Sequence, residues 1–247
     1  MTLSWIDLVD EINKFCINLT RNKIFKDEND DFLLHVQKCL KLNKKEDWNY
    51  ILGSEDILED TNLAIKEFLK FGISGPTKYQ SLGEKYLRLY GVLNAIYLQQ
   101  QAILNIHKFF NCQNNTELRE KFSLLGATAL RHKLGSHSAN FDCKNTSSMQ
   151  IFVPVRFEFG DFSCAYSNPI NDEYHTVDLK ASIEEHLKLV SDAYLTVSNK
   201  MITTIYKSNK DKIAELESKL EPFSLMLSGK LITKIANSDS YSVISAV

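Results

Sequence analysis

The most constraining feature of the sequence is an unbroken apolar repeat that begins after Asp178 and continues to Ile205. Apolar residues recur there every three or four positions, and neither Gly nor Pro interrupts them. This spacing predicts a helix of about 30 residues whose stripe packs in the core and, given its length, can also contribute to a subunit interface. The 247 residues include only nine Gly and four Pro, which favours long helices over many turns. The fold class that we predict is therefore mainly α.

Further helical patterns lie in the N-terminal region. One begins after Ser4, and the others cover residues 32–40 and 63–69. The last of these patterns ends at Gly72, because residues 72–76 combine two glycines with a proline that cannot continue a helix. We predict two domains: an N-terminal helical extension, residues 1–75, that packs on a main domain, residues 76–247.

The centre of the chain predicts a long antiparallel helical hairpin. Residues 80–112 keep a helical period without a proline, and we interpret their Gly91 as a tolerated weak point or a close packing contact. A polar turn follows, and Thr116 is a suitable N-cap for the next helix, residues 116–134. We expect the two helices to pack side by side in opposite directions.

The period changes from helical to alternating after Gly135. A polar loop leads into residues 151–159, which alternate between two faces, and a Gly-Asp pair can then reverse the chain. We predict one β-hairpin insertion at about residues 150–166. Pro154 is expected on an edge strand, because proline has no N–H to donate to a neighbouring strand.

The C-terminal region predicts a charged helix over residues 209–220. Pro222 is expected to break this helix. A short apolar segment, residues 223–235, and a serine-rich end follow it.

Charge and cysteine content limit the partners and the compartment. Lys and Arg total 29 and Asp and Glu total 31, a formal net charge of −2, so any contact with nucleic acid has to be local. The five Cys are scattered without a C-x-x-C pair, which is typical of a reducing compartment. The N-terminus lacks the pattern of a signal peptide, and no stretch of about 18 apolar residues occurs. We expect a cytoplasmic protein that does not enter a membrane.

One short segment, residues 130–137, concentrates groups that can act on a phosphodiester. It holds two His, one Arg and one Lys. Arg131 supplies a permanent charge whose fork matches phosphate oxygens, and the imidazole of His137 can take or return a proton near neutral pH. On an ideal helix these two side chains point roughly 120° apart. We therefore expect Gly135 to end the helix in the left-handed region, so that His137 turns back toward Arg131.

The residues alone leave two interpretations of this segment open. An Arg and a His suffice for metal-free RNA cleavage, in which the ribose 2′-hydroxyl attacks its own phosphate. Alternatively, the basic residues form a solvated cap that stabilises the negative end of the helix dipole. A nucleophilic Ser136 is disfavoured, because nothing indicates an oxyanion hole or an orienting acid.

The segment Arg131-His132-x4-His137 resembles the R-x4-6-H signature of the HEPN superfamily. Its polar residue after the arginine and its position after two long helices are similar to that family as well. The resemblance covers roughly residues 78–210 and implies a HEPN-like helical bundle built on the hairpin. The loop and β-hairpin of residues 138–166 depart from the minimal family pattern.

The resemblance also implies a function. HEPN ribonucleases are metal-independent endoribonucleases that serve as toxins, phage-defence effectors or RNA-processing factors, and two protomers form one composite active site; other members are inactive RNA- or protein-binding modules. By position, Arg131 would stabilise the phosphate, His137 would act as general base or acid, and His132 would assist. The implied partners are RNA, a second copy of this chain and an antitoxin or regulatory protein, with no cofactor.

Residues close to a motif often contact the substrate, because binding groups gather on loops. We predict substrate contacts for four neighbours of the motif: Lys133, Ser136, Asn140 and Lys144.

Other polar residues have structural explanations. His35 and His107 lie in apolar helical patterns and are expected to be packed. His175 and His186 lack the ligand spacing of a metal site, and no metal is predicted. The three glutamines at residues 99–101 are expected on an exposed polar face, with a cleft that binds nucleotide edges as the alternative.

Overall fold

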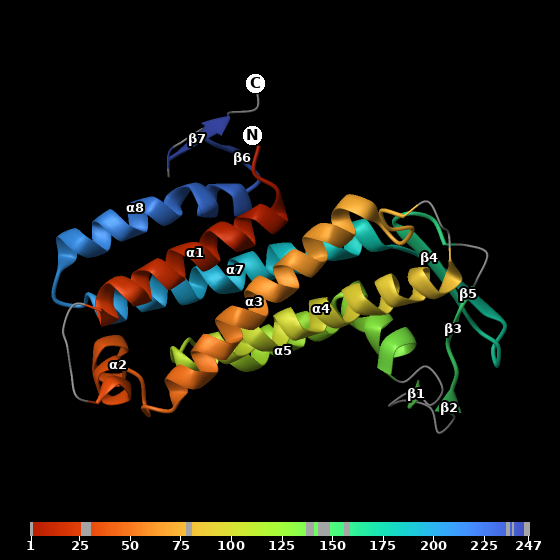
Figure 1. The fold of residues 1–247 in the computed structure, drawn as a ribbon, viewed down its shortest axis with the longest axis horizontal. Coiled ribbons are helices and arrows are strands. Elements are labelled where there is room, and N and C mark those ends of the chain that lie inside the picture. Colours follow the sequence, from red (N-terminus) through yellow and green to blue (C-terminus); the bar gives the residue numbers. More distant parts are fainter. Residues whose placement is uncertain are drawn as a thin grey trace. The chain divides into compact units, whose positions relative to one another are not determined.

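Helices make up most of the chain in the computed structural model (Figure 1). The structure describes residues 2–25, 31–77, 81–136, 141–142, 149–155, 159–235, 238 and 240–244. The helices are α1 (Trp5–Ile24), α2 (Phe32–Leu40), α3 (Asp47–Phe71), α4 (Leu82–Phe109), α5 (Asn115–Leu124), α6 (Gly126–Leu130), the π-helix η1 (Arg131–Ser136), α7 (Leu179–Ile205) and α8 (Lys210–Leu227). The strands are β1 (Phe141–Asp142), β2 (Met149–Gln150), β3 (Val153–Pro154), β4 (Ser163–Asn168), β5 (Glu173–Asp178), β6 (Leu231–Lys234) and β7 (Tyr241–Ile244). The mainly α prediction is confirmed.

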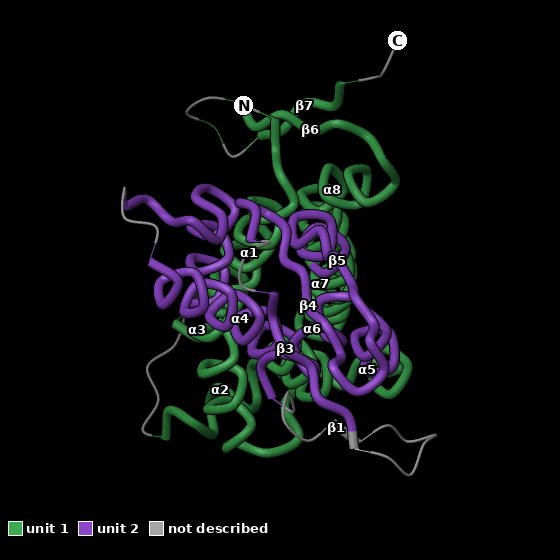
Figure 2. Tube along the Cα trace, turned by 90° about the vertical axis from the view of Figure 1, so that its right-hand side faces the viewer, with its two compact units in different colours: residues 1–59, 101–118, 187–247 green, residues 60–100, 119–186 purple. Residues whose placement is uncertain are grey.

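The chain forms two compact units that interleave along the sequence (Figure 2). Unit 1 consists of residues 1–59, 101–118 and 187–247, and unit 2 consists of residues 60–100 and 119–186. Helices α3, α4, α5 and α7 each contribute residues to both units. The predicted domain boundary after residue 75 stays a prediction, and each unit contains residues from both sides of it.

In unit 1, helix α1 lies beside α8 and beside the second half of α7 (Figure 1). Tyr194 of α7 is fully buried and donates its hydroxyl hydrogen to Asn13 Oδ1 of α1 at 2.6 Å. Cys16 Sγ and Ser198 Oγ lie 3.1 Å apart between the same two helices. These contacts pair the polar groups that the apolar interface buries, as burial requires.

Helix α8 continues through Pro222, so the predicted break is wrong. Leu216 and Leu220 are buried before the proline, and Phe223 and Met226 continue the same buried stripe after it. Burial of two more large side chains outweighs the one backbone hydrogen bond that a proline removes. Packing therefore decides the length of this helix.

A two-stranded sheet follows α8, where the sequence predicts only an apolar segment. Strands β6 and β7 pair antiparallel, with Lys234 opposite Tyr241. Leu3 N donates to Ile232 O at 2.8 Å, which brings the N-terminus of the chain against β6.

The predicted β-hairpin of unit 2 is confirmed and extended by one strand. The sheet has the order β3-β4-β5, so Pro154 lies on an edge strand as expected. Gly160 N donates to Ser163 O at 3.0 Å in the turn between β3 and β4. Phe152 is buried and Ile151 and Val153 are exposed, so the face that carries Phe152 packs inward.

Helix α3 begins at Asp47, well before the periodic residues that predicted it, and ends as expected before Gly72. Gly72 has a φ of +62°, and a side chain there would collide with the Asp161 carbonyl oxygen. Ile73 N donates to that same oxygen at 2.7 Å. Only glycine therefore fits the point where the end of α3 meets the turn of the sheet.

Helix α4 forms as predicted, and its Gly91 has no neighbour within 4 Å of where a Cβ would stand. A close packing contact at Gly91 is thus absent from this chain as the structure describes it. The following helix begins at Asn115, so Thr116 is not its N-cap. Hydrogen bonding of Gln100 Nε2 to Thr128 Oγ1, at 2.8 Å, links α4 to the returning chain in unit 2.

The returning helix is interrupted at Leu125, which has an extended backbone, and so α5 and α6 are separate. Thr128 Oγ1 donates to the Phe122 carbonyl oxygen at 2.7 Å and satisfies an acceptor near the break.

Helix α7 confirms the apolar stripe of the sequence. Its buried stripe residues are Leu179, Ile183, Leu187, Val190, Tyr194, Val197, Met201 and Ile205. In the ranges that the structure describes, no helix has both the length and the apolar character that crossing a membrane requires.

Candidate functional site

The basic motif of the sequence lies on the π-helix η1, which continues directly from α6 in unit 2. Gly135 belongs to this π-helix and does not have a positive φ, so the expected left-handed helix end is wrong. A π-helix closes its turns with hydrogen bonds from residue i to i+5 and is frequent at functional sites. Residues 131–136 therefore stay helical, although the sequence predicted that the helix ends at Gly135.

Arg131 stacks its guanidinium on an aromatic ring. Its Cζ atom lies 3.9 Å from the centroid of the Tyr97 ring of α4. A Cβ at Gly135 would stand 3.8 Å from Arg131 Cγ, so the Arg131 stem runs along the glycine backbone. Stacking orients the planar fork and leaves its N–H groups available at the edges. Within the described part of the chain, the structure gives Arg131 no ion pair with a carboxylate.

Lys133 points to the sheet of unit 2. Its Nζ donates to the Tyr166 hydroxyl at 2.9 Å, and lies 5.1 Å from the centroid of that ring and 5.0 Å from that of Phe152. The two rings meet edge to face at 5.9 Å. The ammonium group is therefore held by one hydrogen bond and two cation–π contacts.

The support of Lys133 extends across the sheet to β5. The Tyr166 ring stacks on the His175 ring with centroids 4.9 Å apart and an interplanar angle of 24°. His175 Nε2 lies 3.5 Å from Glu173 Oε2. This row of side chains fixes the position of η1 relative to the sheet within unit 2.

The other predicted site residues divide into two groups. His132 is half-buried and Ser136 is exposed on η1, next to Arg131 and Lys133 in the chain. His137, Asn140 and Lys144 lie outside the residues that the structure describes. The structure therefore brings Arg131 together with Tyr97, and the expected approach of His137 to Arg131 stays a prediction.

The aromatic partners of the motif are not evident from the sequence. Tyr97 belongs to a pattern that predicted a helix, and Phe152 to one that predicted a strand. Neither pattern indicates that these rings form cation–π contacts with Arg131 and Lys133. Tyr166 and His175 face each other because β4 and β5 pair in this register. No signal in the sequence identifies these contacts, because they join segments far apart along the chain.

Gln99 and Gln100 are buried, so the expected exposed face is wrong for these two glutamines. His186 Nε2 donates to Gln99 Oε1 at 2.8 Å, and Gln99 Nε2 donates to Asn62 Oδ1 at 3.4 Å. Burial lowers the pKa of His186 to about 3, which keeps its imidazole neutral. These amides take part in buried polar contacts, so the alternative of a nucleotide-binding cleft is not supported for these two residues.

His35 and His107 are packed, as the sequence predicts. His35 Nε2 lies 2.8 Å from Ile24 O, and His107 is buried beside the side chain of Asn115. Among the described residues, no group of three or more His, Cys, Asp or Glu side chains could hold a metal ion.

Comparisons of the chain with protein-family models, with curated proteins and with solved structures gave no match. The resemblance to the HEPN superfamily therefore rests on the motif and its position after the helical hairpin.

Proposed function

We propose that the protein is a metal-independent endoribonuclease of the HEPN type. The single observation that carries this proposal is the arginine of the motif, whose guanidinium lies over the Tyr97 ring and has no described carboxylate partner. A guanidinium that is oriented but not neutralised is suited to hold a phosphodiester. An arginine of a solvated helix cap has no need of an aromatic platform.

The chemistry follows from the residue types of the motif. His137 takes the proton of the ribose 2′-hydroxyl, whose oxygen attacks the adjacent phosphorus. Arg131 stabilises the negative charge that develops on the phosphate oxygens. The imidazole of His137 returns this proton to the leaving 5′-oxygen, so the products carry a 2′,3′-cyclic phosphate and a 5′-hydroxyl. His132 assists as a polar neighbour, and Lys133, Ser136, Asn140 and Lys144 contact the substrate.

A homodimer with a composite site is part of the proposal, and an exposed face of α4 supports it. Leu87 is 71% exposed, and Tyr90, Asn94 and Leu98 follow at helical spacing on the surface of unit 2. The open space at Gly91, within this face, lets the backbone of a second helix come close. Tyr97, which carries Arg131, adjoins Leu98. Two copies that meet through α4 would thus bring both arginines near one interface.

A role as toxin or phage-defence effector in the cytoplasm, with an antitoxin or regulatory partner, follows by analogy with the family. The alternative function is an inactive HEPN-like module that binds RNA or protein through the same basic motif. It differs from the enzyme in one measurable respect, since it binds RNA without cleaving it.

The test is RNA cleavage by the purified chain in EDTA, with Arg131→Ala and His137→Ala as variants. We expect the wild type to release 2′,3′-cyclic phosphate ends and both variants to lose at least about a hundredfold in rate. Arg119→Ala is the matched control, because it removes an exposed arginine of α5 outside the motif. Cleavage that persists in both motif variants would overturn the proposal, and loss of wild-type cleavage in EDTA would overturn its metal-free form. Binding without cleavage would establish the alternative.

A further inference from the structure

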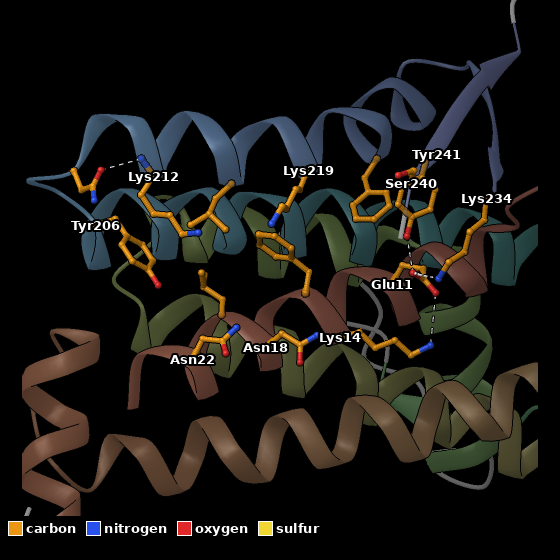
Figure 3. Close-up of a pocket in the computed structure, with 15 residues that line it drawn as sticks. Glu11, Lys14, Asn18, Asn22, Tyr206, Lys212, Lys219, Lys234, Ser240 and Tyr241 are labelled. Carbon is orange, nitrogen blue, oxygen red and sulfur yellow. Dashed lines mark hydrogen bonds and ion pairs between the residues drawn. The ribbon is translucent and has the colours of Figure 1, made fainter. Parts of the chain in front are cut away.

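A groove of about 910 Å³ lies within unit 1. None of the residues that line it belongs to the basic motif, which is part of unit 2. Helix α1 forms one wall and α8 forms the other (Figure 3). Tyr206, directly after α7, lies at one end, and Tyr241 of the β6-β7 hairpin lies at the other. The volume is within the range of sites that bind small molecules.

Both walls are built by side chains at helical spacing. On α1, the aromatic ring of Phe15 is followed by the amides of Asn18 and Asn22 along the same face. On α8, Lys212 and Lys219 alternate with apolar side chains that close the floor. The groove therefore presents an amide row, a cation row and an apolar floor to one ligand.

At one end of the groove, the charge of Glu11 is neutralised by another lining residue, Lys234. Glu11 Oε2 accepts from Lys234 Nζ at 2.7 Å and from the Tyr241 hydroxyl at 2.5 Å. Glu11 is the one carboxylate among the described lining residues, and these two bonds occupy it. The lysines of the α8 wall therefore do not face a carboxylate from within the groove.

The α8 wall already holds an anion at its rim. Glu215 Oε2 lies 2.7 Å from Lys212 Nζ, and Glu215 Oε1 lies 3.0 Å from Lys219 Nζ. Glu215 is exposed and is not part of the lining, and the two lysines hold its pKa below its usual range. Two ammonium groups thus converge on one carboxylate, and a doubly charged phosphate would suit them better.

The side-chain amides of the α1 wall can form hydrogen bonds with a ligand. Asn18 and Asn22 are exposed, and the structure records no hydrogen bond of their side chains to any residue it describes. Both belong to the lining of the groove and are drawn on α1 in Figure 3. Each amide offers donors and an acceptor, the groups that pair with the edge of a nucleobase.

We propose that this groove binds a nucleoside phosphate. The phosphate displaces the Glu215 carboxylate from Lys212 and Lys219, the base packs on Phe15, and Asn18 and Asn22 bond to the edge of the base. A free phosphate lacks the ring that the apolar floor accepts, and an uncharged nucleoside lacks the anion that the lysines require. The site is independent of the proposed ribonuclease activity.

The experiment is calorimetric titration of the full chain with AMP, ATP, GTP, adenosine, inorganic phosphate and a short RNA oligonucleotide. We expect at least one nucleotide to bind more tightly than both adenosine and phosphate. The double variant Lys212→Ala, Lys219→Ala should weaken that binding by about tenfold or more, and Phe15→Ala by about fivefold. The double variant Lys207→Ala, Lys210→Ala is the control, because it removes the same charge from exposed positions outside the lining.

Each other result contradicts the proposal. If no nucleotide binds, or if the control weakens binding as much as the groove variant, the groove is not a nucleotide site. If only the RNA oligonucleotide binds, and the double variant Lys212→Ala, Lys219→Ala weakens that binding, the groove holds a nucleic acid strand instead. Circular dichroism of every variant checks the fold, and the variant pair Lys212→Arg, Lys219→Arg should restore binding because it keeps both charges.

Discussion

The guanidinium carbon of Arg131 lies 3.9 Å from the centroid of the Tyr97 ring, and this stacking is the contact that orients the motif. Tyr97→Ala should therefore lower RNA cleavage, because the guanidinium loses its platform and samples more rotamers. A cation–π contact of about 1 kcal/mol corresponds to about fivefold in kcat/KM. Tyr97→Phe is the control, since it keeps the ring and should keep the rate. Equal rates for Tyr97→Ala and wild type would show that the platform does not serve the reaction.

Lys133 and Tyr166 should be energetically coupled. Their hydrogen bond of 2.9 Å joins η1 to the sheet, and a hydrogen bond with a charged donor contributes about 1.5–3 kcal/mol; solvent screening at the half-buried Lys133 reduces this to about 1 kcal/mol. The measurement is a double-mutant cycle in urea with Lys133→Met, Tyr166→Phe and the double variant. Free energies of unfolding that add without coupling would show that the contact does not stabilise unit 2.

The same variants, tested for RNA binding, distinguish two roles of Lys133. If Lys133 contacts substrate, as the sequence predicts, Lys133→Met should weaken RNA binding more than Tyr166→Phe does. If Lys133 only positions η1, the two variants should affect binding alike.

Glu55 should make the protein less stable as the pH rises. The side chain is 5% exposed, and burial, helped by the charge of Asp56 and opposed by Arg21, raises its pKa to about 7. The folded state then binds a proton that the unfolded state has released, so stability falls between about pH 4.5 and pH 7, by about 3 kcal/mol in total. Above that window the loss is complete.

Urea unfolding at pH 5 and pH 8 measures this effect. Glu55→Gln should remove the part of the dependence that Glu55 contributes and raise the stability at pH 8, because a neutral amide replaces the buried carboxylate. Glu59→Gln, one turn along α3 and exposed, is the matched control. An equal pH dependence in wild type and Glu55→Gln would contradict the prediction. His186 has the opposite effect on stability below pH 6.5. Its imidazole stays neutral in the folded state at pH 5, because its pKa there is about 3, but it becomes protonated in the unfolded state. This protonation favours unfolding as the pH falls.

Leu87 should be required for dimerisation. Leu87→Asp places a charge in the proposed α4 interface and should convert the dimer to a monomer in sedimentation velocity, with RNA cleavage lost in parallel. Leu124→Asp is the control, because Leu124 is 84% exposed on α5 and lies outside this face. A wild type that sediments as a monomer at all concentrations would refute the interface.

The sequence predicted most helices because their signals are local. Ser4 accepts a hydrogen bond from Asp7 N and begins α1, and Asn209 does the same for Lys212 N at the start of α8. Gly72 ends α3 because its φ is positive. Apolar spacing predicted the buried stripe of α7, since a helix repeats its faces every three to four residues.

Local signals failed where distant segments decide the outcome. Pro222 stays inside α8 because the buried stripe continues past it, and Gln99 is buried because His186 and Asn62 satisfy its amide. Gly135 remains helical within a π-helix that no residue pattern announces.

The sequence by itself determined the mainly helical fold, the start of α1, the end of α3 and the basic motif with Arg131. Only the tertiary structure decided that Tyr97 supports Arg131, that Tyr166 holds Lys133 and that α1 and α8 enclose a lysine-lined groove. The physical reason is the range of the forces involved. Backbone hydrogen bonds and side-chain spacing act within a few residues, while each of these contacts joins side chains that only packing brings together.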